Sequence, residues 1–213
     1  MTDAARVFCL VLDSLGVGEL PDAARFGDVG AHTLDHLIDA AGRPAIPRLE
    51  ALGLGNVPGV TGLPRVERPA GAVGRLAERS PGKDTSTGHW ELMGCVLESE
   101  FPTFPDGFPP EILEPWVERA ALPGWLCNAA ASGTEVIARL GEESIASGKP
   151  IVYTSADSVF QVAAHEEHFG LERLYRACEV AREILTPYGI GRVIARPFVG
   201  EAGGFERTYN RRD

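Results

Sequence analysis

The hydrophobic and polar positions of the chain predict alternating strands and helices. Residues 7–12 are continuously apolar and rich in strand formers, which is typical of a parallel strand buried on both faces. Helical spacing of apolar residues predicts helices over residues 33–41, 47–52, 85–94, 111–121, 135–140 and 171–185. Further strands are predicted over residues 72–76, 150–154, 159–163 and 192–195. The alternation indicates an α/β protein.

The acidic balance of the chain argues against a nucleic-acid-binding protein. The 20 Lys and Arg against 30 Asp and Glu give a net charge of −10, whereas such proteins need a surplus of cations to displace phosphate counterions. With 44% hydrophobic and 23% charged residues, the chain can form an ordinary folded core. Its 25 Gly and 16 Pro predict many turns, where functional residues often lie.

The cysteines and the apolar segments predict a cytoplasmic protein. No two of the four cysteines have the C-x-x-C spacing of a metal or redox motif, so we expect reduced thiols. The apolar run of residues 7–12 is too short for a signal peptide or a membrane span, and no later segment is long enough. We therefore expect no association with a membrane.

Two glycine-rich segments suggest nucleotide-binding motifs, and both fail on spacing. Gly16 and Gly18 follow a predicted strand, but Pro21 stands where a dinucleotide fingerprint needs its third glycine. In the loop at Lys83, a P-loop would need glycine at Ala77 and Ser or Thr at Asp84. The Lys83 loop instead brings three hydroxyl side chains, residues 85–87, to the start of a helix, where anions bind readily.

Asp13 and Thr85 are the first candidates for chemistry. Asp13 follows the predicted buried strand, where it is either a turn residue or a metal ligand or catalyst. For the Lys83 loop, one interpretation is helix capping, with Asp84 or Thr85 as the N-cap. The other makes Thr85 a nucleophile, and because no adjacent His base is apparent, a divalent cation would activate its hydroxyl.

The histidine pairs and the C-terminal arginines are further candidates. His32 and His36 have the spacing of helical metal ligands, but a packing or solvated pair is the better interpretation. His165 begins a charged run, residues 165–168, that is most simply a solvent-facing turn. Arg196 and residues 207–212 gather cations in an acidic chain, as surface charge or for phosphate recognition.

Five ordered segments together resemble the phosphopentomutase family of the alkaline phosphatase superfamily: residues 11–18, 26–31, 82–91, 150–159 and 196–211. The resemblance covers the whole chain. It implies an α/β fold with a partial alkaline-phosphatase-like core, a parallel-rich sheet flanked by helices, over residues 1–97. An α/β cap domain over residues 98–213 would follow, and the linker at residues 102–110 marks the approximate boundary.

The resemblance also implies roles for single residues. Asp13 would be a metal-ligating aspartate, and Thr85 the phosphorylated threonine that also lies against the metal ions. Ser155, Asp157 and Arg196 fall in segments that would hold the sugar phosphate. One further arginine belongs near the end of the chain, and both Arg207 and Arg211 are candidates.

The implied reaction interconverts ribose 1-phosphate and ribose 5-phosphate, or the 2-deoxy pair, with two Mn²⁺ ions. A phosphothreonine and a sugar bisphosphate would be intermediates, and a bisphosphorylated sugar would prime the enzyme. The C-terminal half of the family's core, with most of its metal ligands, is not in this sequence, so we expect the chain alone to be inactive. The alternatives are another metal-dependent phosphatase or phosphomutase of the superfamily, or a non-catalytic phosphosugar-binding module.

Overall fold

The computed structural model describes residues 6–12 and 14–213, which form two compact units. The N-terminal unit ends at Glu78, and the C-terminal unit runs from Arg79 to Asp213. The division into core and cap at residues 97 and 98 stays a prediction. Within the described ranges, none of the helices combines the length and apolar character that crossing a membrane requires.

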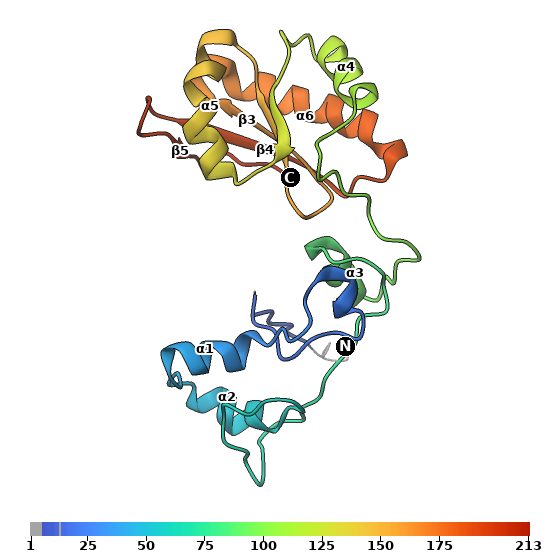
Figure 1. Ribbon diagram of the computed structural model, residues 1–213, viewed down its shortest axis with the longest axis vertical. Helices are drawn as coiled ribbons and strands as arrows, with labels where there is room; N and C mark the ends of the chain where they lie inside the picture. The colour runs from blue at the N-terminus through green and yellow to red at the C-terminus, as the bar shows by residue number, and fades with distance from the viewer. Residues whose placement is uncertain (1–5, 13) are drawn as a thin grey trace, which may run out of the picture. The chain divides into compact units, whose positions relative to one another are not determined.

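The described residues of the N-terminal unit form two α-helices, which Figure 1 labels, and two 3₁₀ turns. Helices α1 (Thr33–Ala41) and α2 (Pro47–Leu52) confirm the predicted bounds. Gly53 ends α2 with a φ of 103°, in the left-handed region that favours glycine. The short turns η1 (Ala23–Phe26) and η2 (Leu54–Asn56) were not predicted.

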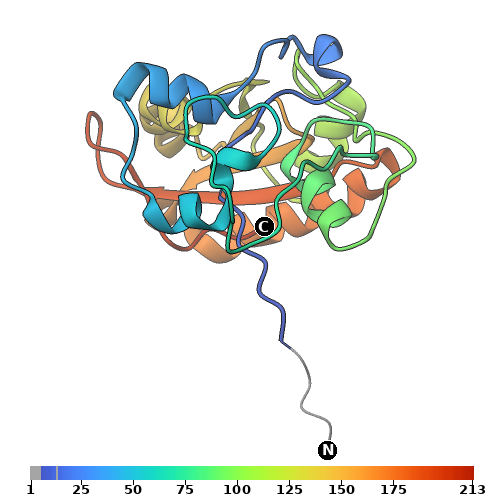
Figure 2. The ribbon, with the colours of Figure 1, turned by 90° about the horizontal axis from the view of Figure 1, so that it is seen from below.

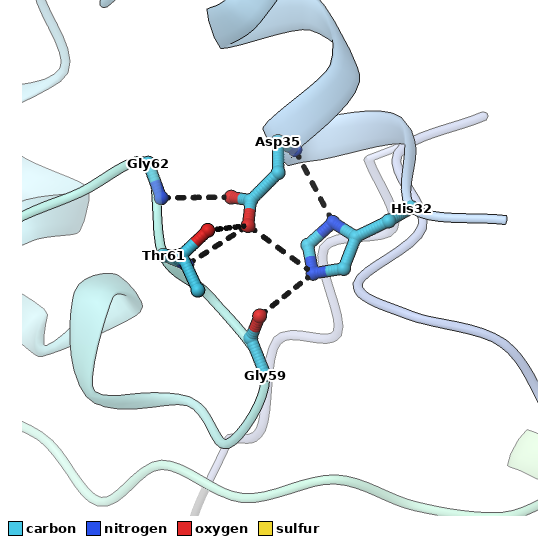
Figure 3. Close-up of polar contacts among 5 residues, drawn as sticks. All are labelled: His32, Asp35, Gly59, Thr61 and Gly62. Carbon is cyan, nitrogen blue, oxygen red and sulfur yellow. Dashed lines mark hydrogen bonds and ion pairs between the residues drawn. The ribbon is translucent and has the colours of Figure 1, made fainter. Parts of the chain in front are cut away.

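The carboxylate of Asp35 connects α1 to a distant loop (Figure 3). One carboxylate oxygen accepts hydrogen bonds from the backbone N–H and the hydroxyl of Thr61, at 2.8 and 2.7 Å, and the other accepts from the N–H of Gly62 at 3.1 Å. His32 caps α1, because its Nδ1 accepts from the N–H of Asp35, and its Nε2 lies 3.1 Å from the carbonyl oxygen of Gly59. His32 therefore has a structural role, in agreement with the interpretation of His32 and His36 as a packing or solvated pair.

The strands predicted over residues 7–12 and 72–76 are wrong. Both segments lack strand structure, and residues 6–12 are drawn as a coil in Figure 2. Val7 is 91% exposed and Leu76 is 89% exposed. A strand needs hydrogen-bonding neighbours, and the described residues of the N-terminal unit form no strand that could pair with either segment.

A five-stranded sheet organises the C-terminal unit. Its strands lie in sequence order: β1 (Leu126–Ala130), β2 (Ile151–Thr154), β3 (Val159–His165), β4 (Arg192–Val199) and β5 (Glu206–Arg207). β1 pairs with β2, and β3 with β4, in parallel, whereas the other two pairs are antiparallel. The sheet is thus mixed. Prediction found β2, β3 and β4 but missed β1 and β5.

Helices cover both faces of the sheet (Figure 1), which confirms the α/β class. Helix α5 (Gly133–Ser147) packs on one face through Val136 and Ile137, and α4 (Pro110–Arg119) and α6 (Leu171–Leu185) pack on the other. The unit also contains helix α3 (Thr85–Leu92) and the turn η4 (Thr186–Tyr188). That the fold is of the alkaline-phosphatase type stays a prediction.

The segment at residues 165–168 is not a simple solvent-facing turn, which corrects the prediction. His165 ends β3 and is buried, and the chain continues into the π-helical turn η3 (Glu166–Gly170). The Nδ1 of His165 accepts from the backbone N–H groups of Glu167 and His168, and its Nε2 lies 3.1 Å from the carbonyl oxygen of Gly200. The ring is therefore a packed cap.

Candidate functional site

Arg196 lies on the face of the sheet that α5 covers. Along β4, Val193 and Ala195 pack with α4 and α6, whereas Phe198 packs with α5. Because side chains alternate along a strand, Arg196 shares the face of Phe198. Its Nε donates a hydrogen bond to Oε1 of Gln161 at 3.1 Å, and partial burial lowers the pKa of its guanidinium.

Arg207 reaches the same face from β5. It pairs with Phe198 across the antiparallel ladder, and paired residues project to one side of the sheet. Its Nη2 donates to the hydroxyl of Thr134 at 3.0 Å, at the start of α5. Arg207, one of the two candidate arginines near the end of the chain, is thus hydrogen-bonded to the helix that covers Arg196.

Arg211 and the next residue, Arg212, point to opposite faces of the sheet. Arg212 forms a bridge with Ala195 and lies over the ring of Tyr175, 3.7 Å from its centroid, on the α6 face. Since adjacent residues of an extended segment point to opposite faces, Arg211 projects to the α5 face. Both Arg207 and Arg211 therefore join Arg196 there, and we name these three residues the arginine cluster.

Tyr153 on β2 lies within electrostatic range of all three arginines. Its side chain packs with α5, and only 1% of the residue is exposed. Burial raises the pKa of the Tyr153 phenol, while the positive charges of Arg196, Arg207 and Arg211 oppose that rise. The phenol therefore stays protonated near neutral pH, and the cluster forms one electropositive group around it.

The carboxylate of Asp213 opposes this positive charge. Asp213 accepts hydrogen bonds from Arg211 at 2.6 Å and from Arg192, outside the cluster, at 2.8 Å. Among the described residues, the ion pairs of the cluster involve this one carboxylate, which Arg192 shares, so three guanidinium groups keep a surplus of positive charge. Such a surplus suits an anionic ligand, because arginine binds phosphate and carboxylate groups in a bidentate geometry.

Ser155 and Asp157 lie in the turn that joins β2 to β3, directly after the strand that carries Tyr153. The hydroxyl of Ser155 accepts a hydrogen bond from the N–H of Asp157 at 3.4 Å. Both residues are half-buried. The roles of Ser155 and Asp157 in binding a sugar phosphate stay predictions.

Thr85 is the first residue of α3, and capping falls to Asp84. The carboxylate of Asp84 accepts from the N–H of Thr87 at 3.0 Å and also from the buried hydroxyl of Thr87. Of the two proposed N-caps, Asp84 is therefore confirmed. Thr85 is exposed, and its carbonyl oxygen, not its hydroxyl, lies 2.7 Å from Nδ1 of His89.

Glu91 fixes the loop that leads to Thr85. Its carboxylate accepts from the backbone N–H groups of Arg79 and Ser80 at 2.8 and 2.7 Å, and from the hydroxyl of Ser80 at 2.5 Å. The Ser80 hydroxyl in turn accepts from the N–H of Leu97 at 3.0 Å. The hydrogen bonds that Glu91 accepts lower the pKa of its carboxyl group, and the bond from the Ser80 hydroxyl has the largest effect. The loop is thus anchored on both sides of α3.

The expected metal site receives no support from the described residues. Asp13 lies outside them, and residues 6–12 and 14–213 contain no group of three or more His, Cys, Asp or Glu side chains that could hold a metal ion. Thr85 with one carboxylate would supply too few ligands for a pair of transition metals. The described residues therefore do not fit the implied metal pair by themselves.

Sequence reasoning missed Tyr153, Gln161 and Thr134 as parts of this site. The period of two in residues 150–154 could have placed Tyr153 beside Ile151 on one buried face, where a phenol needs a polar partner. Gln161 is a polar residue in an otherwise apolar strand, which is a similar signal. Thr134 carries no such signal, because Ser and Thr are common at helix starts.

Comparison with known proteins gives one consistent result. No family model matches the chain. Proteins named phosphopentomutase are 55% identical to it in Symbiobacterium thermophilum, over 100% of this chain and 55% of that protein, and 56% identical in Caldanaerobacter subterraneus, over 98% and 53%. A phosphopentomutase from an Anaeromyxobacter species is 55% identical over 99% of this chain and 54% of its own length. The chain spans about half the length of the curated relatives it matches.

Proposed function

The chain belongs by sequence to the phosphopentomutase family, and on this premise we propose that it carries the pentose-phosphate-binding face and the phosphorylated threonine of such an enzyme. The reaction is an isomerisation of ribose 1-phosphate and ribose 5-phosphate, or of their 2-deoxy forms. The arginine cluster is the observation that carries the binding part of this proposal, because it brings three cations to one face of an otherwise acidic chain.

The arginine cluster would bind the phosphate group of the sugar. Arg196 is held by Gln161 and Arg207 by Thr134, so both guanidinium groups are oriented before a ligand arrives. Prior orientation reduces the entropy lost on binding. Ser155 and Asp157, on the adjoining turn, would contact the hydroxyl groups of the pentose.

Thr85 would carry the transferred phosphoryl group. The bond between phosphorus and Oγ of Thr85 breaks as the oxygen of a free hydroxyl of the pentose monophosphate bonds to phosphorus. The proton of that hydroxyl ends on Oγ of Thr85, so the products are a bisphosphate and the free threonine. Oγ of Thr85 then bonds to the other phosphorus of the bisphosphate, the bond from that phosphorus to the sugar oxygen breaks, and the sugar oxygen takes the threonine proton to give the isomeric monophosphate. The start of α3 favours the charge of a phosphothreonine through the helix dipole, and the Asp84 cap leaves the Thr85 hydroxyl out of the helix hydrogen bonds.

Two Mn²⁺ ions belong to the proposal for the active enzyme, with Asp13 and Thr85 among their ligands. Such ions neutralise charge in phosphoryl transfer. The binding role of the arginine cluster does not depend on them, so it can be tested separately.

Binding is tested best with two adjacent arginines. Arg211→Ala removes a cation from the α5 face, whereas Arg212→Ala removes one from the α6 face. We expect the first variant to weaken binding of ribose 5-phosphate about tenfold or more, measured by isothermal titration calorimetry. The second should leave the affinity close to wild type. Equal losses in both variants would mean that only net charge matters and would contradict the site.

The phosphoenzyme is tested by mass spectrometry of the active enzyme after incubation with a pentose bisphosphate. Thr85→Ala should abolish the covalent phosphoryl group. Ser86→Ala, at the next hydroxyl along the chain, is the control and should retain it. Phosphate that persists in the Thr85→Ala protein would exclude Thr85 as the nucleophile.

A further inference from the structure

The hydroxyl of Tyr153 has no hydrogen-bond partner among the residues that the structure describes, although the side chain is buried. A buried polar group without a partner loses its hydrogen bonds to water and gains none in return, so such groups are uncommon in folded proteins. Its charged neighbours, Arg196, Arg207 and Arg211, are donors only. What the protonated phenol lacks is therefore an acceptor.

The same hydroxyl lies against the first residue of α5. A Cβ atom built on Gly133 would lie 2.6 Å from the Tyr153 oxygen, so the phenol ends at the N-terminus of a 15-residue helix. Ser132, the N-cap, makes no side-chain hydrogen bond to the helix within the described chain. The first backbone N–H groups of a helix lack intrahelical acceptors, and the helix dipole makes this end positive.

Three kinds of group thus surround one position: the guanidinium groups of the cluster, the start of α5 and an unpaired phenol. All three favour an acceptor with negative charge. A phosphate group supplies several strong acceptor oxygens and so matches this set of donors. Thr134 connects the first two kinds of group directly, because it belongs to the first turn of α5 and its hydroxyl accepts from Arg207.

We propose that Tyr153 is a further substrate-positioning residue, whose hydroxyl donates a hydrogen bond to a phosphoryl oxygen of the pentose phosphate. The start of α5 faces the same phosphate, and Gly133 leaves the space that the phenol occupies. This assignment rests on the proposed function, because it needs the arginine cluster to bind the sugar phosphate.

The decisive variant is Tyr153→Phe, which removes the hydroxyl and keeps the ring. We expect its affinity for ribose 5-phosphate, measured by calorimetry, to fall about tenfold or more. Its Tm without ligand should equal or exceed that of the wild type, because an unpaired buried hydroxyl is lost. Tyr188→Phe, at an exposed tyrosine, is the matched control and should change neither quantity. A purely structural role would instead lower the Tm of Tyr153→Phe.

Two outcomes separate this inference from the proposed function. If wild type and Arg211→Ala both fail to bind ribose 5-phosphate, the proposed function and this assignment both fail. If wild type binds, Arg211→Ala binds weakly and Tyr153→Phe binds as wild type does, the assignment of Tyr153 alone is wrong.

A spectroscopic readout checks the contact itself. The chain has four tyrosines, so protein labelled with 3-fluorotyrosine should give four ¹⁹F resonances, and Tyr153→Phe identifies one of them. Ribose 5-phosphate should shift the Tyr153 resonance and leave that of Tyr188 in place. Gly133→Ala, whose methyl group would press on the phenol oxygen, should weaken binding. An unmoved Tyr153 resonance at saturating ligand would overturn the assignment.

Discussion

The C-terminal unit buries apolar side chains on both faces of a sheet, whereas the N-terminal unit depends more on turns and polar contacts. In the C-terminal unit, Phe160 touches the rings of Phe108 and Trp116 in one cluster, and α5 closes a second cluster. In the N-terminal unit, Asp35 connects α1 to the loop at Thr61 (Figure 3), and large apolar residues such as Phe8 stay exposed. The C-terminal unit, which contains the sheet, thus buries far more apolar surface within itself than the N-terminal unit does.

The largest expected difference between the units comes from matched phenylalanines. Phe160→Ala removes a fully buried ring and should lower the free energy of unfolding of the C-terminal unit by about 3–5 kcal/mol. Phe8→Ala, at a residue that is 82% exposed, should change stability by no more than about 0.5 kcal/mol. Urea unfolding followed by NMR resolves both. A large loss in Phe8→Ala would show that residues 7–12 are buried in solution.

The same difference explains which elements were predictable from sequence. Helices α1, α2 and α6 have local signals, namely apolar spacing and terminal Gly or Pro, and their bounds are confirmed. Residues 7–12 have the composition of a buried strand, but strand formation also requires partners elsewhere. β1 was missed because its residues Cys127 and Asn128 have positive φ, an irregularity that no hydrophobic pattern encodes.

The candidate site was partly predictable, for a related reason. Composition and motifs singled out Arg196, Arg207 and Arg211, yet only strand register shows that all three share one face while Arg212 does not. Register is set by long-range pairing, which one sequence does not display. Tyr153 was missed because the sequence does not show that its buried hydroxyl lacks a hydrogen-bond partner among the described residues.

Backbone contact distances give the next prediction, within the N-terminal unit. A Cβ on Gly55 would lie 2.1 Å from the carbonyl oxygen of Pro64, so Gly55→Ala forces the backbone apart and should cost about 1–3 kcal/mol. Gly74→Ala is the control, because a Cβ there meets no atom within 4 Å in the described structure. Equal amide hydrogen-exchange rates around α2 in the two variants would refute this close contact.

Asp35 provides a smaller, pH-dependent effect in the same unit. Burial alone would raise the pKa of its carboxyl group, but hydrogen bonds from Thr61 and Gly62 bring it below the ordinary value. The unfolded chain therefore takes up this proton first as pH falls. The stabilisation is present above the unfolded-state pKa of about 3.9 and is lost as pH falls through the lower folded-state pKa.

Asp35→Asn should accordingly lower the stability of the N-terminal unit by about 1–2 kcal/mol at neutral pH, where the carboxylate is charged. The loss should shrink on acidification below pH ~4. Asp39→Asn, on the same helix, is a control for charge alone. Acid titrations followed by NMR of the amide groups of Thr61 and Gly62 measure both variants. A loss that did not change with pH would contradict the role of the charged form.

The smallest effect concerns thiol reactivity and leaves stability unchanged. Burial raises the pKa of the Cys178 thiol to about 12, whereas Cys9 in the N-terminal unit is exposed. Because the thiolate is the nucleophile, iodoacetamide at pH 8 should modify Cys9 much faster than Cys178. Cys95 is exposed in the C-terminal unit and should react like Cys9, which separates exposure from location in the chain. If Cys95 instead reacted as slowly as Cys178, the protection would belong to the whole C-terminal unit and not to the apolar packing around Cys178.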